Sequence, residues 1–143
     1  MTTTEAASAD DLNRALGLVR RLEMDPVGRA VLEYEAGLHM CHSGGVVQGG
    51  FISGWLDAAM AHAVIARIGF EMTPMSLELK ISFFAPARPG KVIAEGWVEK
   101  AGRSSCFTEG RLLDGKGEVL AKASSTIRMI PRSKVEAAAR AAT

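Results

Sequence analysis

One apolar stretch, residues 51–68, limits how this 143-residue chain can fold. It contains no proline, and Ala, Met, Leu, Ile and Trp dominate it, so it predicts an α-helix of roughly 27 Å at about 1.5 Å per residue. The stretch is apolar nearly all round, so we expect the helix to be buried in the protein rather than to lie on its surface. Asp57, His62 and Arg67 interrupt it, which argues against a membrane span.

A glycine-rich turn, residues 44–50, leads directly into this helix. Glycines let a backbone come close to a ligand, and the N–H groups at a helix start attract partial negative charge. Asp57 lies beyond the first turn, and the small residues Ser53, Gly54 and Ala61 leave room beside it. N–H groups that polarise a carbonyl, with a carboxylate that attacks or activates water, suit acyl transfer. A buried Asp bonded to a backbone donor or an arginine is the structural alternative.

The segment QGGFISGWLD, residues 48–57, resembles the signature of the PaaI-type hotdog acyl-CoA thioesterases. That family typically has an Asn, a Gly, an HGG segment and an acidic residue nine positions after the His. Gln48, Gly49 and Gly50 stand at the HGG positions, and Asp57 stands at the acidic one. The chain departs from the pattern twice: Gln48 replaces the usual His, and His42 stands where the family usually has Asn. The resemblance extends to about residue 130.

The resemblance implies roles for individual residues. The backbone N–H of Gly49 would polarise the thioester carbonyl, and Asp57 would act as nucleophile or as general base on water. His42 would contact the carbonyl or position water, and Ser76 would help to orient that water. The residues expected to bind the rest of the substrate are Gln48, Gly50, Gly102, Arg103 and Ser104.

Each of these roles has a structural alternative. His42 can be a loop histidine, Ser76 a solvent-facing strand serine, and Gln48 a residue that holds the turn. Arg103 suits a phosphate because of its guanidinium fork, but an exposed turn arginine is an equal alternative. His62 lies roughly 140° round the helix from Asp57, so we expect a core or interface histidine rather than a general base.

Most of the remaining chain is predicted to be β-structure. Residues 10–24 read as a helix with Leu12, Leu16, Val19 and Leu22 on one face, and residues 36–45 as a loop or short strand. Predicted strands cover residues 30–34, 75–84, 92–100, 104–113 and 118–130, with a hairpin at 114–117. The strand at 75–84 alternates: Leu77, Leu79, Ile81 and Phe83 share one face, and Ser76, Glu78, Lys80 and Ser82 the other.

One buried helix with hairpin-linked strands predicts an α+β fold with an antiparallel sheet wrapped around the helix. This is the hotdog fold that the resemblance implies. Residues 1–25 are expected to form an N-terminal segment with a helix that packs on the domain, 26–131 the hotdog domain, and 132–143 a flexible Ala-rich tail.

Charge and cysteine content exclude several classes of function. A formal net charge of +1 gives no reason to expect nucleic acid or membrane partners. Cys41 and Cys106 form no disulfide framework, and without a signal peptide the cytoplasm is the expected compartment. His39, Cys41 and His42 lie close together but lack the spacing of a zinc site, so we expect no metal and no cofactor beyond the CoA of the substrate.

The sequence therefore predicts hydrolysis of an acyl-CoA thioester to a free acid and CoA. The resemblance implies a homodimer or a dimer of dimers, with Asp57 and Ser76 on one subunit and residues 42–49 on its partner. A non-catalytic hotdog protein that binds acyl-CoA or a small ligand is the main alternative, because the two motif departures can mark lost activity. A hotdog hydratase is a third, although its expected Asp and His are not visible. The sequence does not specify the acyl group.

Overall fold

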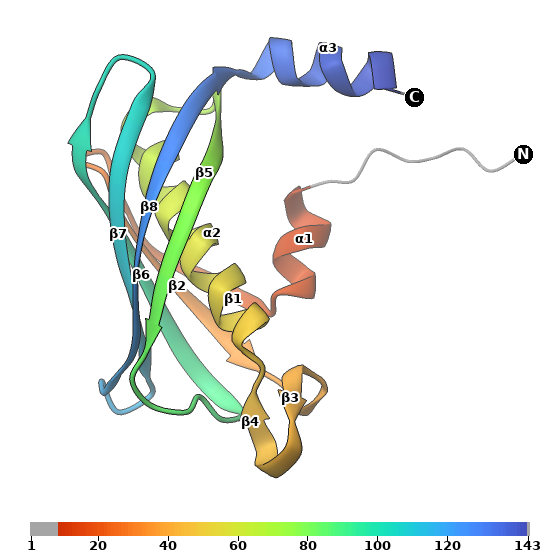
Figure 1. The fold of residues 1–143 in the computed structure, drawn as a ribbon, viewed down its shortest axis with the longest axis vertical. Coiled ribbons are helices and arrows are strands. Elements are labelled where there is room, and N and C mark those ends of the chain that lie inside the picture. Colours follow the sequence, from red (N-terminus) through yellow and green to blue (C-terminus); the bar gives the residue numbers. More distant parts are fainter. Residues whose placement is uncertain (1–8, 143) are drawn as a thin grey trace, which may run out of the picture.

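The computed structural model describes residues 9–142, so residues 1–8 of the predicted N-terminal segment lie outside it. A six-stranded antiparallel sheet curves around one long helix, α2 (Figure 1). The helices are α1 (Ala9–Ala15), α2 (Gly49–Ile68) and α3 (Arg132–Ala142), with short 3-10 turns at Leu38–Met40 and Ser43–Gly45. The strands are β1 (Leu18–Asp25), β2 (Arg29–Ala36), β3 (Cys41–His42), β4 (Val46–Val47), β5 (Met72–Phe83), β6 (Gly90–Ala101), β7 (Ser105–Asp114) and β8 (Val119–Pro131).

The strand order confirms the predicted α+β hotdog fold. The sheet runs β1-β2-β6-β7-β8-β5, so β1 and β5 are its two edges, and β3 and β4 form a separate small ribbon. The predicted hairpin joins β7 to β8, where Oδ1 of Asp114 accepts hydrogen bonds from the N–H groups of Lys116 and Glu118, both at 2.9 Å. Short connections of this kind give neighbouring strands opposite directions.

Two glycines in the sheet let α2 lie close to it. A side-chain carbon on Gly96 of β6 would come within 2.4 Å of the Ala59 carbonyl oxygen, and one on Gly110 of β7 within 3.3 Å of the Met60 side chain. By length and composition α2 could cross a membrane. Its apolar residues instead pack against the sheet, and Trp55 is fully buried and stacks on Tyr34 with ring centroids 5.8 Å apart. We therefore take α2 as the core helix that the sequence predicts.

The helix predicted for residues 10–24 is wrong in its second half. Helix α1 ends at Ala15, and Leu18–Asp25 form the edge strand β1. The pairing of β1 with β2 has two irregularities, between Leu18 and Arg20 and between Arg21 and Glu23, which interrupt the two-residue alternation of a strand. The apolar residues are then spaced as in a helix, which explains the error. The supposed helix face is largely exposed, since Leu12, Val19 and Leu22 are 62%, 45% and 49% exposed.

The C-terminal residues form a helix with little contact to the domain. Residues 132–142 of the predicted tail fold as α3, which projects away from the end of β8 (Figure 1) and buries no residue. Helix formation agrees with the alanine content of this segment. Its flexibility stays a prediction, as does the division of the chain into three parts.

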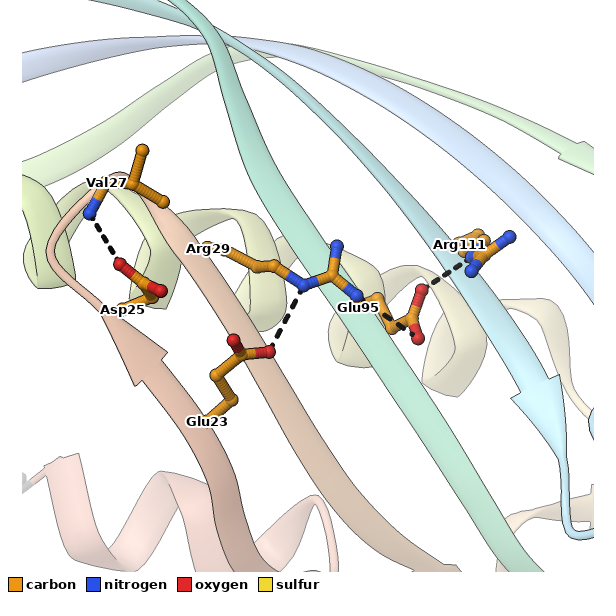
Figure 2. A network of polar contacts seen from close by, with 6 residues as sticks. All are labelled: Glu23, Asp25, Val27, Arg29, Glu95 and Arg111. Atoms are coloured by element: carbon orange, nitrogen blue, oxygen red, sulfur yellow. Dashed lines mark hydrogen bonds and ion pairs between the residues drawn. The ribbon is translucent and has the colours of Figure 1, made fainter.

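The sheet face away from α2 carries a network of charges (Figure 2). Arg29 on β2 contacts Glu23 on β1 at 3.1 Å and Glu95 on β6 at 3.4 Å, and Arg111 on β7 contacts the same Glu95. The network links four adjacent strands through alternating charges. The helix side of the sheet is apolar and this side is charged, which is the pattern of a sheet that buries one face.

Candidate active site

The side chain of Gln48 caps the N-terminus of α2. Its Oε1 accepts a hydrogen bond of 3.0 Å from the Gly50 N–H, and its carbonyl accepts one of 3.0 Å from Phe51. This is an N-cap, and it uses the N–H of Gly50. The N–H of Gly49, the first of the helix, has no partner within the helix. Gln48 therefore holds the turn, and Gly49 keeps the donor that an oxyanion needs.

Gly50 is required by this cap. A side-chain carbon on Gly50 would lie 2.6 Å from Oε1 of Gln48, too close for the hydrogen bond to form as it does. Gln48 and Gly50, both predicted to bind substrate, thus lie at the helix start and are hydrogen-bonded to each other. The same geometry gives them a structural role that the resemblance did not imply.

Gly49 faces a pocket of about 410 Å³ between the helix start and the end of β5. His42 lines the same pocket, so the structure brings together two residues that sequence reasoning placed in one site. The other lining residues are mostly apolar: Val46, Val47, Ile52, Phe83, Phe84, Ala85, Pro86 and Ala87. The pocket can hold an apolar group beside a backbone N–H and an imidazole.

Asp57 and Ser76 form a second pair. The Ser76 hydroxyl donates a hydrogen bond of 2.6 Å to Oδ1 of Asp57, across the space between α2 and β5. Asp57 is half-buried, and its partner lies on β5, an edge strand of the sheet. A hydroxyl that donates to one carboxylate oxygen leaves the other oxygen, Oδ2, for a water or a substrate.

The predicted strand face of Ser76 is wrong. Regular alternation would place Ser76 with Glu78 on the outer side of the sheet, away from the helix. The pairing of β5 with β8 is instead irregular between these two residues: Ser76 pairs with Ile127 and Glu78 with Thr126. The extra residue, Leu77, turns Ser76 to the helix side, which the single sequence does not reveal.

Within one chain the two pairs lie apart. Gly49 and Asp57 are eight residues apart on one helix, which corresponds to about 12 Å along its axis. A carbonyl bound at the Gly49 N–H is therefore out of reach of the Asp57 carboxylate of the same chain. The structure brings His42 to Gly49 and Ser76 to Asp57, but it does not bring the two pairs together.

The turn formed by Gly102, Arg103 and Ser104 is farther still from Gly49. It joins β6 to β7 at the end of the sheet where α2 finishes, whereas Gly49 lies at the opposite end (Figure 1). The Ser104 carbonyl accepts a hydrogen bond of 2.8 Å from Met129 near the end of β8. All three turn residues are exposed. They cannot share a ligand with Gly49 of the same chain.

Comparison with known proteins gives this geometry a family. The family described as the thioesterase superfamily matches residues 44–121, more than half of the chain, which includes Gly49, Asp57 and Ser76. The chain belongs to the thioesterase superfamily. A curated protein of Saccharolobus solfataricus that carries the name esterase is 32% identical to this thioesterase over 110 residues, 77% of each chain.

Solved structures agree with the hotdog fold of this thioesterase. A phenylacetic acid degradation-related protein of Ralstonia eutropha is 28% identical, with a TM-score of 0.76 over 87% of this chain and 93% of its own. The PaaI protein of Escherichia coli, from the phenylacetic acid degradation operon, is 20% identical, with a TM-score of 0.78 over 85% and 86%. Together they confirm the resemblance to PaaI-type hotdog thioesterases.

The other polar candidates do not join either pair. Among residues 9–142, no group of three or more His, Cys, Asp or Glu residues could hold a metal ion. The Sγ of Cys41 faces the Gly37 carbonyl at 3.6 Å. His62 donates from Nδ1 to the Ala58 carbonyl at 2.7 Å, and burial lowers the pKa of its imidazole. Burial raises the pKa of the Cys106 thiol, so it is no ready nucleophile.

Sequence reasoning missed three residues that lie beside these two pairs. Phe83 stands over Gly49, since a side-chain carbon on Gly49 would lie 3.2 Å from its ring. Glu78 lies in the irregular part of β5 near Ser76, where its carbonyl accepts a hydrogen bond from Ser125 and its side chain accepts one from the Thr126 N–H. The aromatic residue at the end of a strand has the same pattern as any core position, and a buried serine on β8 gives no local signal at all.

Proposed function

We propose that this thioesterase hydrolyses acyl-CoA to a free acid and CoA, with Asp57 as its catalytic carboxylate. The observation that carries the proposal is the 2.6 Å bond from Ser76, on the edge strand β5, to the half-buried Asp57 on α2. A half-buried carboxylate in an apolar helix is costly, and a single serine is a weak structural reason to keep it there. A role in chemistry accounts for it better.

The reaction needs an electrophile, an attacking group and a way to expel the thiolate. The Gly49 N–H at the positive end of α2 polarises the thioester carbonyl and stabilises the oxyanion that forms on it. Oδ2 of Asp57 either attacks the carbonyl carbon to give a mixed anhydride, which water then hydrolyses, or takes a proton from the attacking water. In both routes the C–S bond breaks and CoA leaves as a thiolate. His42 hydrogen-bonds the carbonyl or holds the water.

A second copy of the chain supplies the missing half of each site. Strand β5 is an unpaired edge twelve residues long, and its Met75, Leu77 and Phe83 are 43%, 60% and 54% exposed. Two such edges can pair antiparallel about a two-fold axis, which covers both. The α2 helices of the two copies then run in opposite directions, so the start of one approaches the middle of the other. Gly49 and His42 of one subunit then face Asp57 and Ser76 of the other.

The same arrangement gives the turn residues 102–104 a role. In this dimer the end of the sheet that carries Arg103 lies next to the start of the partner's α2. The Arg103 guanidinium can then bind a phosphate of the CoA whose thioester lies at that helix start. We propose no metal, no cofactor other than the CoA of the substrate, and neither nucleic acid nor membrane as a partner. The homodimer, alone or as a dimer of dimers, acts in the cytoplasm.

A thiol-release assay over a panel of alkyl and aryl acyl-CoAs tests the function. Release of CoA with at least one substrate, at a rate that scales with enzyme, supports it. Tight binding of acyl-CoA by calorimetry with no release across the panel would instead indicate a binding protein. Single-turnover hydrolysis in H₂¹⁸O detects attack by Asp57 when water opens the mixed anhydride at the Asp57 carboxyl carbon: the product acid then carries unlabelled oxygen from the protein, and ¹⁸O enters Asp57.

A further inference from the structure

Strand β5 changes face at one residue, and this change brings Ser76 to Asp57. Leu77 is the extra residue, because Ser76 pairs with Ile127 while Glu78 pairs with Thr126, the next residue of β8. With regular alternation the Ser76 hydroxyl would lie on the opposite side of the sheet from Asp57. The hydrogen bond in the site therefore depends on what holds the bulge at Leu77 in place.

Two side chains hold it. The Ser125 hydroxyl donates a hydrogen bond of 2.7 Å to the Glu78 carbonyl, and the Thr126 N–H donates one of 2.8 Å to Oε1 of Glu78. A bulge takes backbone groups out of the regular ladder, and buried backbone groups need partners. Here a side chain from each strand provides a partner for a backbone group of the other. Both bonds involve Glu78, the residue directly after the bulge, so they fix the strand at that point.

Ser125 is an exception in the apolar face that covers α2. It is 3% exposed, and the residues on either side of it on that face of β8 are Ala123 and Ile127. Thr108 of β7, 2% exposed, donates its hydroxyl to the Ser125 carbonyl at 2.9 Å. Thr108 and Ser125 are both buried hydroxyl residues in a core that is otherwise mostly apolar. Buried hydroxyls cost stability unless they are bonded, and this connected pair leads to the bulge.

We propose that Ser125 and Glu78 are positioning residues of the active site, which lock the bulge at Leu77 so that Ser76 faces Asp57. Neither touches the substrate, and both act through Ser76. The kinetic consequence rests on the proposed thioesterase reaction, whereas the structural one does not. Bulges beside active sites re-aim side chains in this way, and they must be fixed to be useful.

Kinetics of matched variants test the proposal. Ser125→Ala removes the hydroxyl, and Ser124→Ala is its control, because Ser124 is on the same strand but faces the other side, where it pairs with Lys80. We expect kcat to fall about tenfold in Ser125→Ala with little change in KM, and to stay unchanged in Ser124→Ala. Glu78→Ala should also lower kcat. Glu78→Gln, whose amide oxygen still accepts from Thr126, should restore it.

The decisive comparison is made in the Ser76→Ala background. A residue that acts only through Ser76 loses its effect once Ser76 has no hydroxyl, so Ser125→Ala should cause no further loss there. A residue that merely supports the sheet would lower activity equally in both backgrounds. Full additivity, or an unchanged kcat in both Ser125→Ala and Glu78→Ala, would overturn the proposal.

Crystal structures of the same variants decide the question without any assay. In Ser125→Ala we expect Ser76 Oγ to move beyond hydrogen-bond distance, about 3.5 Å, from Asp57, and in Ser124→Ala to stay bonded. Ser76 still bonded to Asp57 in Ser125→Ala would overturn the inference. If the wild type hydrolyses no acyl-CoA, the proposed function fails, but the Ser76–Asp57 distance in the variant structures still tests the positioning role of Ser125. If Ser125→Ala does not fold, Glu78→Ala, which alters an exposed residue, serves in its place.

Discussion

The Ser76 hydroxyl donates a 2.6 Å hydrogen bond to Oδ1 of Asp57, so an edge strand and the core helix are joined by a polar contact. This contact orients the carboxylate. The Gly49 N–H lies at the start of α2, where Gly49 and the His42 imidazole line a separate pocket. The predictions below test whether these two halves form one site.

Replacing Asp57 by Asn should remove hydrolysis while the fold persists. The amide keeps the size of the carboxylate and can still accept from Ser76, but it can neither attack a thioester nor take a proton. We expect kcat/KM to fall by at least about 100-fold, with an unchanged circular dichroism spectrum. Activity within about tenfold of wild type, a loss of only ~1.4 kcal/mol, would show that another group is the catalytic carboxylate.

Gly49→Val should damage activity more than Gln48→Ala. A branched side chain at Gly49 would meet the Phe83 ring and block the thioester from the N–H. Gln48→Ala removes the helix cap, which we expect to lower stability by about 1 kcal/mol in urea denaturation and to leave most activity. The opposite ranking of the two kcat/KM values would move the oxyanion contact from the backbone to the Gln48 side chain.

Chelators should not change activity. Incubation with EDTA, followed by gel filtration and the thiol-release assay, should give wild-type rates, because the proposed reaction uses an N–H group and a carboxylate in place of a Lewis acid. Loss that a divalent ion restores would return attention to His39, Cys41 and His42 as a metal site.

Mixing two inactive variants should restore activity if each site is shared between subunits. Asp57→Asn and His42→Ala are mixed under conditions where subunits exchange, after each is shown to be folded and nearly inactive. A hybrid dimer has one site with both lesions and one with neither, so random mixing should recover about a quarter of wild-type activity. If His42→Ala alone stays active, Gly49→Val serves as the second lesion.

The outcome against the shared site is equally clear. No recovery, with exchange confirmed by mass spectrometry of tagged chains, would mean that each subunit carries its own complete site. The distance of about 12 Å between Gly49 and Asp57 along α2 would then have to be bridged within one chain, which the helix does not allow without a large change.

His62 should make the stability of the protein depend on pH. Burial lowers the pKa of His62, and the nearby Arg21 charge adds to this, although the bond to the Ala58 carbonyl opposes it. The unfolded chain therefore binds more protons than the folded one below about pH 6.5, so the free energy of unfolding should fall as the pH drops through this range. Urea denaturation from pH 5 to 7.5 should show a weaker fall in His62→Gln. Parallel curves for the two proteins would contradict this.

The long elements of the fold could be predicted from the sequence because their patterns are uninterrupted. The helix predicted for residues 51–68 is α2, two residues short at its start, and Leu79, Ile81 and Phe83 share the helix side of β5 as predicted. Failures occurred where a strand is irregular. The breaks in β1 imitate a helix, and the bulge at Leu77 reverses Ser76. A bulge depends on bonds from a neighbouring strand, here from Ser125, that local spacing cannot encode.

The candidate site was predictable only in its sequence-local part. Gly49 and Asp57 share one helix, so their spacing is visible in the chain. The contact of Ser76 with Asp57 crosses between elements, and the pocket at Gly49 is completed by Phe83. The role of Gln48 as a cap was open from the sequence, and the structure shows it in the hydrogen bond that its Oε1 accepts from the Gly50 N–H.

The bare surface at Gly96 has a consequence for anyone who would redesign this enzyme. Because Gly96 has no side chain, the Ala59 carbonyl of α2 packs directly against the backbone of β6. This contact sets the distance between the helix and the sheet at that point. A methyl group added at this position would clash with the Ala59 carbonyl and push α2 away from the sheet, which would move Asp57 away from Ser76. Changes in substrate preference are therefore best sought among the pocket residues Phe83 and Phe84. Gly96 should be kept, because it sets the distance between α2 and the sheet.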